Sequence, residues 1–335
     1  MNSVLKTPVL GLVVPCYNEE QMISKTVEQL CSLLQKLVDE QLIAPESFAV
    51  FVNDGSKDRT WNILAQYKNH FVRALKLSNN VGHQHALLAG LTYVTNKADC
   101  CISLDADLQD DISVIPQMIR DFQSGAQIVY GVRSSRDTDK AMKKGTAHLY
   151  YKLLKRLGVD VVFDHADYRL LSNKVLVELQ KYKEVNLFLR GLFPLMGFQS
   201  SIVYYDRLER EAGETHYPFK KMLQLAINGI TSFSNVPLKV ITRIGLVVFF
   251  GSLLTSLWVF VVMLRGKNIP GWTSTTLPIY FLGGVQMLML GIIGEYLGKI
   301  YLEVKGRPRF HVEEETPAPK GEGSAQRPNS AQLNY

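Results

Sequence analysis

The first part of the chain alternates short apolar runs with segments of helical periodicity. In residues 22–42, for example, Ile23, Val27, Leu30 and Leu34 recur at the spacing of one buried helix face. Predicted strands occupy residues 9–15, 48–52, 72–77, 100–104 and 127–130, and predicted helices occupy residues 22–42, 61–67, 84–94 and 112–122. Apolar strands that alternate with helices predict an α/β fold with a mostly parallel, doubly wound sheet.

Polar clusters follow four of the predicted strands, at residues 16–20, 53–56, 79–82 and 105–111. Because ligands of doubly wound sheets bind outside the carboxyl ends of the strands, we place these clusters in one cleft. We interpret it as a nucleotide cleft in which Asp54 accepts from a base or ribose, while Gly55 and Gly82 permit close backbone approach. Neither Gly-x-Gly-x-x-Gly nor Gly-x-x-x-x-Gly-Lys-Ser/Thr occurs, which argues against a dinucleotide enzyme and a P-loop NTPase.

One of these clusters begins with two aspartates, Asp105 and Asp107, directly after an apolar run. Carboxylates two residues apart leave a strand on the same side, and hard oxygen ligands suit Mg²⁺ or Mn²⁺ bound together with substrate phosphates. The pattern predicts a metal site, with Asp107 as a direct ligand and Gln109 as a further metal or donor contact. The alternative interpretation is that Asp107 or Asp110 only caps the following helix.

Two long stretches near the C-terminus, residues 244–264 and 271–294, contain no charged residue. Each reaches the length of about 20 apolar residues that a transmembrane helix needs, so together they predict a two-helix hairpin. A pair of buried core helices is the alternative. Lysine and arginine residues flank both outer ends of the hairpin, which places those ends in the cytoplasm by the positive-inside tendency.

The segment before the hairpin combines lysines with apolar residues between positions 217 and 230, as a helix lying in the membrane interface does. Beyond Val312, Glu, Pro, Gly, Ser and Gln predominate, which predicts a solvated tail that is disordered after about residue 313. The expected organisation is a cytoplasmic catalytic domain (1–213), juxtamembrane interface helices (214–243), two transmembrane helices (244–298) and a cytoplasmic tail (299–335).

Composition narrows the class of protein. The 335 residues are 47% hydrophobic and 20% charged, which is typical of a globular chain, and the net charge is +6. This mild basic bias fits an anionic membrane face or phosphorylated ligands, and the absence of a clustered basic run argues against nucleic acid. The four cysteines show no metal-binding spacing and are expected to be reduced. Residues 1–8 lack the pattern of a signal peptide, so the first domain is expected to stay in the cytoplasm.

Several motifs taken together resemble one enzyme family. They are Val14-Pro15-Cys16-Tyr17-Asn18-Glu19-Glu20, Asn53-Asp54-Gly55-Ser56, Gly82-His83-Gln84, Asp105-Ala106-Asp107-Leu108-Gln109-Asp110, Asp167-Tyr168-Arg169, Glu209-Arg210-Glu211-Ala212-Gly213-Glu214 and Gly294-Glu295-Tyr296-Leu297-Gly298. In this combination the chain resembles the family 2 glycosyltransferases, which share the nucleotide-sugar-binding fold called GT-A. It is most similar to the subset that uses polyprenyl phosphates, such as bactoprenol glucosyltransferases and dolichol-phosphate mannose synthase.

The resemblance implies a reaction at the cytoplasmic face of a bacterial inner or plasma membrane. A hexose, with UDP-glucose as the first choice of donor and UDP-N-acetylhexosamine or GDP-mannose as alternatives, passes with inversion to a polyprenyl phosphate such as undecaprenyl phosphate. The resemblance also implies a divalent metal and a homo-oligomer such as a tetramer. Two other classes remain open: a processive polysaccharide synthase, against which the lack of a Gln-x-x-Arg-Trp motif argues, and a catalytically silent membrane-anchored binding protein.

The resemblance and the residue chemistry together nominate the site residues. The catalytic candidates are Asp105, Asp107 and Asp167. Asp167 is offered as a base by the resemblance, but a phosphate monoester is already ionised near neutral pH, so we expect it to position other groups; the alternative is a simple ion pair with Arg169. The donor candidates are Pro15, Tyr17, Asn18, Glu19, Asp54, Gly82, Gln84 and Asp105, and the metal candidates are Asp107 and Gln109. The candidates for the acceptor phosphate are Arg133, Arg210, His216 and Lys220.

Overall fold

The computed structural model describes residues 7–134, 165–185, 189–206 and 271–316, with some further positions between 238 and 261. Contacts within the chain divide it into two units. The first consists of Met1–Gly145, Val161–His216 and Arg307–Tyr335, and the second of Thr146–Asp160 and Tyr217–Gly306. The first unit therefore includes residues from both sides of the second in the sequence.

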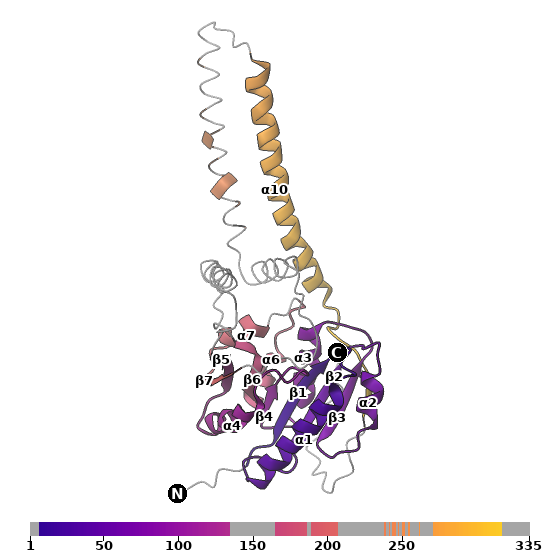
Figure 1. The fold of residues 1–335 in the computed structure, drawn as a ribbon. Helices are drawn as coiled ribbons and strands as arrows, with labels where there is room; N and C mark the ends of the chain where they lie inside the picture. Colours follow the sequence, from indigo (N-terminus) through magenta and orange to yellow (C-terminus); the bar gives the residue numbers. More distant parts are fainter. Residues whose placement is uncertain are drawn as a thin grey trace. The chain divides into compact units, whose positions relative to one another are not determined.

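The described part of the first unit is built on one mixed sheet in the order β7-β5-β6-β4-β1-β2-β3-β8 (Figure 1). The strands are β1 Leu10–Cys16, β2 Phe48–Asn53, β3 Val72–Leu77, β4 Cys100–Ser103, β5 Ile128–Arg133, β6 His165–Ser172, β7 Ser200–Tyr205 and β8 Val312–Glu315. Strands β4, β1, β2 and β3 are parallel, as are β5 and β7, whereas β6 runs antiparallel to β4 and β5 and β8 runs antiparallel to β3. The sheet is therefore mixed but mostly parallel, as predicted, with β6 and β8 running against the other strands.

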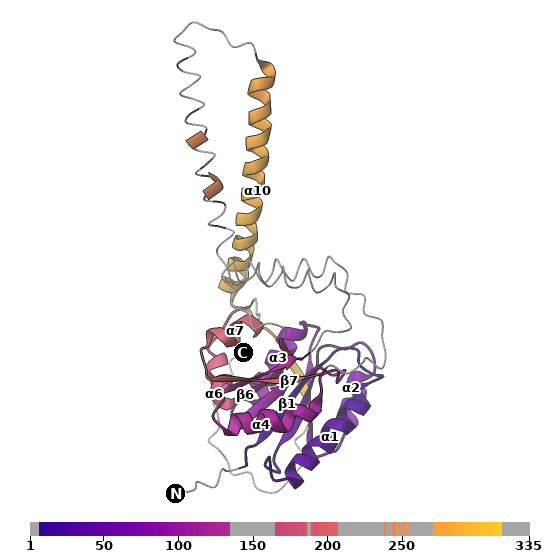
Figure 2. The same cartoon turned by 60° about the vertical axis from the view of Figure 1, so that its left-hand side comes forward.

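Helices cover both faces of the sheet (Figure 2). They are α1 Ile23–Asp39, α2 Thr60–Gln66, α3 His83–Val94, α4 Ile115–Gln123, which follows the 3₁₀ turn η1 Ile112–Val114, α6 Asn173–Leu179 and α7 Leu189–Leu195. Along β1, Leu12 and Val14 pack in the core under α1, while Val13 packs on the other face with α3. This alternation confirms the doubly wound α/β prediction.

The elements predicted up to residue 130 are all present, with ends that differ by a few residues. Strand β6 was not predicted. Asp167 and Arg169 interrupt its apolar pattern, and both are buried in the structure. Period-two hydrophobicity identifies a strand only when its inward side chains are apolar, so a strand that buries an ion pair escapes that test.

Strand β8 corrects the expectation of a tail that is solvated from residue 312 onward. Its residues are exposed, yet they pair with the edge of β3, and Thr316 N donates to the carbonyl oxygen of Ala74 at 3.0 Å. Two side-chain contacts reinforce the pairing, Lys76 with Glu313 at 3.2 Å and the Tyr93 hydroxyl donating to Glu315 at 2.7 Å. An unpaired sheet edge offers backbone partners to any extended segment, whatever its hydrophobicity.

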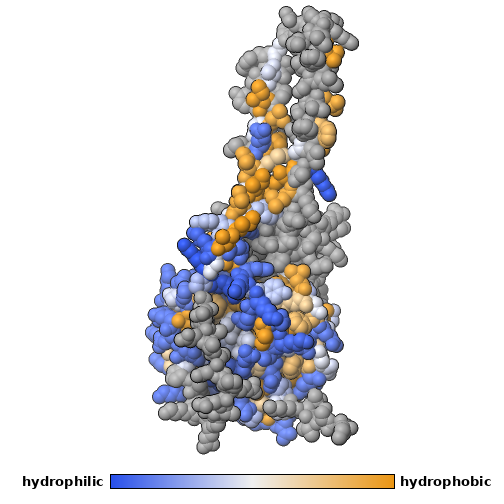
Figure 3. All heavy atoms as spheres, turned by 180° about the vertical axis from the view of Figure 1, so that it is seen from behind, coloured by the Kyte–Doolittle hydropathy of each residue, from blue (hydrophilic) through white to orange (hydrophobic). Residues whose placement is uncertain are grey.

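In the second unit, helix α10 spans Trp272–Lys305, so it covers the second uncharged stretch and continues past residue 294. Several of its large apolar side chains are exposed, among them Ile279, Leu290 and Leu297, and Figure 3 shows hydrophobic side chains gathered along this helix. Among the described residues, no helix combines the length and apolar character needed to cross a membrane. Most of the predicted span 244–264 and residues 214–237 and 317–335 lie outside the described residues.

We predict that ending the chain after His311 lowers the melting temperature by about 4–8 °C. Loss of β8 removes several backbone hydrogen bonds worth about 2 kcal/mol together, and about 1 kcal/mol corresponds to 2–4 °C in a domain of this size. Thermal unfolding followed by circular dichroism measures the change. The control ends after Thr316 and keeps β8, so it should melt like the full chain; equal melting temperatures for the two truncations would contradict the role of β8.

Candidate active site

The acidic loop, residues 104–111, follows β4 at the edge of the sheet where β1, β2 and β4 end. Two backbone carbonyls anchor it to its surroundings. Leu104 N donates to the carbonyl oxygen of Val13 on β1 at 3.1 Å, and the buried Thr26 hydroxyl on α1 donates to the carbonyl oxygen of Ala106 at 2.7 Å. The acidic loop is therefore held both by the sheet and by the helix that covers it.

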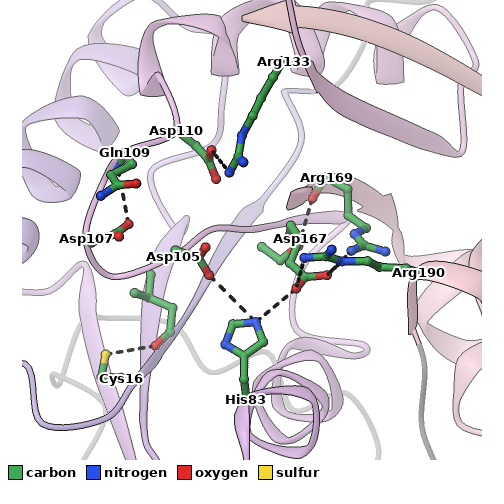
Figure 4. A network of polar contacts seen from close by, with 12 residues as sticks. Cys16, His83, Asp105, Asp107, Gln109, Asp110, Arg133, Asp167, Arg169 and Arg190 are labelled. Carbon is green, nitrogen blue, oxygen red and sulfur yellow. Dashed lines mark hydrogen bonds and ion pairs between the residues drawn. The ribbon is translucent and has the colours of Figure 1, made fainter. Parts of the chain in front are cut away.

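Asp105 and Asp107 do not leave a strand side by side, so that expectation is wrong. Strand β4 ends at Ser103, and the chain then turns, with Leu108 N donating to the carbonyl oxygen of Asp105 at 3.3 Å. Asp105 points toward His83, whereas Asp107 accepts from the backbone N–H of Gln109 at 3.3 Å (Figure 4). The alternation of side chains along a strand applies only where the extended backbone continues.

The alternative in which Asp107 or Asp110 caps the next helix is also wrong. Asp111 is the cap of η1, and its carboxylate accepts from Ser113 N at 2.8 Å. Asp110 is instead buried and accepts from the Tyr205 hydroxyl at 2.5 Å and from Arg133 Nη2 at 3.2 Å. Arg133, a predicted ligand of the acceptor phosphate, is thus paired with Asp110. Through Arg133 on β5 and Tyr205 on β7, Asp110 connects both strands to the acidic loop.

Asp167 on β6 is the most heavily paired carboxylate of the site. It is 6% exposed, and its oxygens accept from Arg169 Nη2 at 2.5 Å and from Arg190 Nε and Nη2, both at 3.2 Å. Burial raises the pKa of Asp167, but the hydrogen bond from His83 and the charges of Arg169 and Arg190 outweigh burial and hold the pKa well below its usual range. Asp167 is therefore ionised, and the ion pair with Arg169 that the sequence suggested is present.

His83, the first residue of α3, lies between the two acidic groups. Its Nε2 is 3.3 Å from Asp167 Oδ2 and 3.8 Å from Asp105 Oδ1 (Figure 4). Burial lowers the pKa of His83, but the hydrogen bond with Asp167 and the charge of Asp105 raise it by more than burial lowers it. The net shift of the pKa is therefore upward. Burial raises the pKa of Asp105 to about 6; the charge of His83 opposes that rise, while Asp110, Asp167 and Asp107 add to it. The local field therefore favours binding of a cation.

Four predicted donor residues lie at the end of β1 and in the loop after it. Pro15 is buried within β1, while Tyr17 and Asn18 are exposed. The Asn18 side-chain oxygen accepts from Lys57 N at 2.9 Å, and Glu19 N donates to the Thr60 hydroxyl at 2.9 Å. This loop is thus tied to the loop after β2 before any ligand binds.

Asp54 organises the loop before α3. Its two carboxylate oxygens accept from Val81 N at 2.7 Å and Gly82 N at 3.0 Å. Gly55 has a φ of +61°, and a Cβ there would lie 2.5 Å from the backbone of Asn79 and Asn80, so the predicted close approach is to the protein's own chain. At Gly82, with a φ of +89°, no atom of the described residues lies within 4 Å of an added Cβ.

The structure brings Asp105, Asp107, Gln109, Asp167 and Arg133 to one edge of the sheet (Figure 4). The three other candidates for the acceptor phosphate, Arg210, His216 and Lys220, lie outside the described residues. Within the part of the chain that is described, no three His, Cys, Asp or Glu side chains are grouped so that they could hold a metal ion by themselves.

Comparison with known proteins identifies the family. The model of glycosyl transferase family 2 matches residues 12–179, about half of the chain, and relatives with 38–50% identity cover 90% of it or more. The chain belongs to glycosyl transferase family 2. The protein is therefore a glycosyltransferase. A second family model, described as the GtrB C-terminal hairpin, matches residues 236–300.

Two relatives and one solved structure illustrate the similarity. The glycosyltransferase is 50% identical to the uncharacterized glycosyltransferase YkoT of Bacillus subtilis over 91% of each chain. It is 40% identical to the bactoprenol glucosyl transferase of Shigella phage SfX, over 90% of this chain and 98% of that one. A structure of the mannosyltransferase PcManGT from Pyrobaculum calidifontis with GDP-Man and Mn²⁺ covers 87% of each chain at 14% identity, with a TM-score of 0.44. Similarity at that level adds nothing about ligands.

Sequence reasoning missed His83 and Arg190 as site residues of the glycosyltransferase. His83 stands between Gly82 and the start of a predicted helix, a position at which a side chain faces the carboxyl edge of the sheet. Arg190 is a lone cation in the apolar run 187–195, which is a signal for a buried ionic partner. Neither signal names the partner, because Asp167 lies far from both in the sequence.

We predict that the His83 imidazole titrates above its ordinary value of 6.5 in the ligand-free protein and that Asp167→Asn lowers the midpoint. The substitution removes a hydrogen-bond acceptor and a negative charge that favour the imidazolium. Because the folded-state pKa is raised, this interaction stabilises the fold fully below pH of about 6.5 and is lost as the pH rises through the raised pKa. NMR of histidine-labelled protein measures the midpoint, and His83→Gln assigns the signal. A midpoint that Asp167→Asn leaves unchanged would disprove the coupling.

Proposed function

We propose that this glycosyltransferase transfers glucose from UDP-glucose to the phosphate of a polyprenyl-phosphate lipid, with inversion at the anomeric carbon. The observation that carries the proposal is the 40% identity to a bactoprenol glucosyl transferase over 98% of that protein. The acidic edge of the sheet supports it, since Asp105 and Asp107 lie where parallel strands end and nucleotide ligands bind. The relative's name also favours glucose over an N-acetylhexosamine or mannose.

The residues at this edge fit a divalent cation. Asp107 and Gln109 supply hard oxygen atoms. Burial raises the pKa of Asp105 to about 6, and the charges of Asp110, Asp167 and Asp107 add to that rise, a repulsion that a bound cation would relieve. We assign Asp107 and Gln109 to Mg²⁺ or Mn²⁺, shared with the donor diphosphate. When bound, the metal neutralises the negative charge that develops on the leaving UDP.

In this reaction a phosphate oxygen of the acceptor attacks the anomeric carbon, and the bond from that carbon to the UDP oxygen breaks. A phosphate monoester has a second pKa of about 6, so the acceptor is already ionised near neutral pH and needs no strong base. Asp167 is a poor base because its pKa is held well below the usual range by His83, Arg169 and Arg190. We assign it the role of positioning His83 and Arg190.

The donor and acceptor sites draw on different elements. We assign the donor to the loops that carry Tyr17, Asn18, Glu19 and Gly82, with Asp54 holding the last of these by two backbone hydrogen bonds. Arg133 is the candidate for the acceptor phosphate that the structure describes, and a guanidinium suits phosphate oxygens. Its ion pair with Asp110 at 3.2 Å would orient it and would weaken when the phosphate binds.

We propose that the C-terminal part anchors the enzyme in the membrane as a two-helix hairpin, with the catalytic domain in the cytoplasm. Three observations support this placement: the uncharged stretches 244–264 and 271–294, the match of residues 236–300 to the GtrB C-terminal hairpin, and the exposed apolar side chains of α10. An acceptor with a polyprenyl chain requires the site to work at a lipid surface. A homo-oligomer, such as a tetramer, belongs to the same proposal.

The test incubates detergent-purified protein with a panel of nucleotide sugars and undecaprenyl phosphate, and identifies the lipid product by mass. We expect one hexose on the lipid phosphate, with UDP-glucose as the preferred donor. Preference for another sugar would correct the donor alone. A water-soluble polymer would indicate a processive synthase, and nucleotide binding without any transfer would indicate a silent binding protein; either result would overturn the proposal.

In this assay we predict that Asp107→Asn lowers the rate of transfer by about 100-fold or more, because a neutral amide is a weak ligand for a hard divalent cation. The same variant should depend less steeply on the concentration of Mg²⁺ or Mn²⁺. The matched control is Asp111→Asn, in which the amide oxygen can still cap η1, so activity should stay close to normal. Near-normal transfer by Asp107→Asn would remove Asp107 from the metal site.

A second prediction separates the two roles considered for Asp167. If it positions other groups, Asp167→Asn should lower kcat by a factor that stays constant above about pH 7, where the acceptor phosphate is ionised. If it is a general base, the factor should shrink as the pH rises. Initial rates of wild type and variant between about pH 7 and 9 distinguish the two patterns. We expect the constant factor, and a loss that disappears at alkaline pH would show that Asp167 removes a proton.

A further inference from the structure

Three consecutive side chains at the start of α3 contact residues that are distant in the sequence. His83 contacts Asp167 on β6. Gln84 Oε1 accepts from the backbone N–H of Leu189 at 3.1 Å, and His85 Nε2 lies 3.0 Å from the carbonyl oxygen of Val185. The first turn of α3 is thus connected both to a site carboxylate and to the chain on either side of residues 186–188.

Leu189 is the first residue of α7, so the contact with Gln84 is made at a helix end. The first backbone N–H groups of a helix have no partner within the helix, and the Gln84 amide oxygen accepts from one of them. Leu189 and Phe193 are buried in the core, which fixes the face of α7 that packs against the sheet. Gln84 therefore connects the first turn of α3 to the first described residue of α7.

The next residue, Arg190, brings this connection back to the site. Its Nε and Nη2 atoms each lie 3.2 Å from a different oxygen of Asp167, a two-point contact that depends on the position of the helix that carries it. Arg190 keeps 36% of its side chain exposed, so solvent competes for its donors. A closed path of contacts results, from Gln84 through Leu189, Arg190 and Asp167 to His83, which adjoins Gln84.

We propose that Gln84 is a positioning residue, not a donor contact: its amide oxygen fixes the start of α7 so that Arg190 meets Asp167 at two points. In this role Gln84 controls the charge balance between Asp167 and His83 without contacting the substrate. The sequence had suggested Gln84 as a residue that binds the donor. The consequence for catalysis rests on the proposed function, whereas the positional role does not.

Two substitutions separate a positioning role from a donor contact. Gln84→Met keeps the length of the side chain but removes the acceptor oxygen, and Gln84→Glu keeps an acceptor oxygen but adds a negative charge. The matched control is Gln180→Met, because Gln180 also hydrogen-bonds α3, donating to the Thr92 hydroxyl at 3.3 Å, but does so away from the site. Arg190→Met provides the reference for complete loss of the contact with Asp167.

The first measurement is the NMR titration of His83 in the full-length, ligand-free protein in detergent. The charge of Arg190 lowers the pKa of His83, so its displacement from Asp167 should raise the midpoint. We expect Arg190→Met and Gln84→Met to shift the midpoint upward, and Gln180→Met to leave it at the wild-type value. A wild-type midpoint in Gln84→Met, together with a shifted midpoint in Arg190→Met, would overturn the proposal. If Gln84→Met does not fold, Gln84→Asn, whose shorter side chain cannot reach Leu189, replaces it.

The second measurement is the kinetics of transfer. For a positioning residue we expect Gln84→Met to lower kcat by about 10- to 100-fold with little change in the donor KM, as small displacements of site groups do. Gln84→Glu should retain most of the activity. A direct donor contact predicts the reverse: a raised donor KM for Gln84→Met and a larger loss for Gln84→Glu, which repels the diphosphate. Should the wild type fail to glycosylate the lipid, the proposed function fails, while the titration still decides the role of Gln84.

Discussion

The buried carboxylate of Asp167 sets the main electrostatic constraint on this site. A buried charge is tolerated only when it is paired and hydrogen-bonded, and Asp167 is paired with Arg169 on its own strand, Arg190 on α7 and His83 on α3. Because these partners come from three elements, the carboxylate can be satisfied only when β6, α3 and α7 are in their native positions. The ionic network therefore links the packing of the core to the geometry of the site.

The same edge of the sheet carries an excess of negative charge that this network does not neutralise. Asp105 lies beside His83, yet its pKa is raised to about 6 by burial and by the neighbouring Asp110, Asp167 and Asp107. Asp110 accepts hydrogen bonds from Arg133 and from the Tyr205 hydroxyl, so this carboxylate of the acidic loop already has partners within the protein. The part that remains suits a cation and the phosphates that accompany it, which fits the nucleotide-sugar chemistry of the family.

Backbone contacts hold the loops of the site, and this explains why several predicted ligand residues serve the protein itself. Asp54 uses both oxygens on the N–H groups of Val81 and Gly82, and the Asn18 oxygen is used by Lys57. Site loops at strand ends lack ladder partners, so side chains must supply the hydrogen bonds that keep them in place. Polar residues in such loops thus have a structural role that a motif does not distinguish from ligand binding.

Local patterns in the sequence determined the alternating strands and helices up to residue 130, the acidic loop and the family motifs, because hydrophobic periodicity and strand-end polarity depend on neighbouring residues. The sequence also suggested the Asp167–Arg169 ion pair, whose members are two residues apart, but partners that are distant in the sequence were decided only by the tertiary structure. Arg190 is 23 residues from Asp167, His85 is 100 residues from Val185, and Ala74 is 242 residues from Thr316. Strand β8 illustrates the reason most clearly: its exposed, glutamate-rich residues carry no hydrophobic signal, and they form a strand because the edge of β3 presents unpaired backbone groups at that place in the fold.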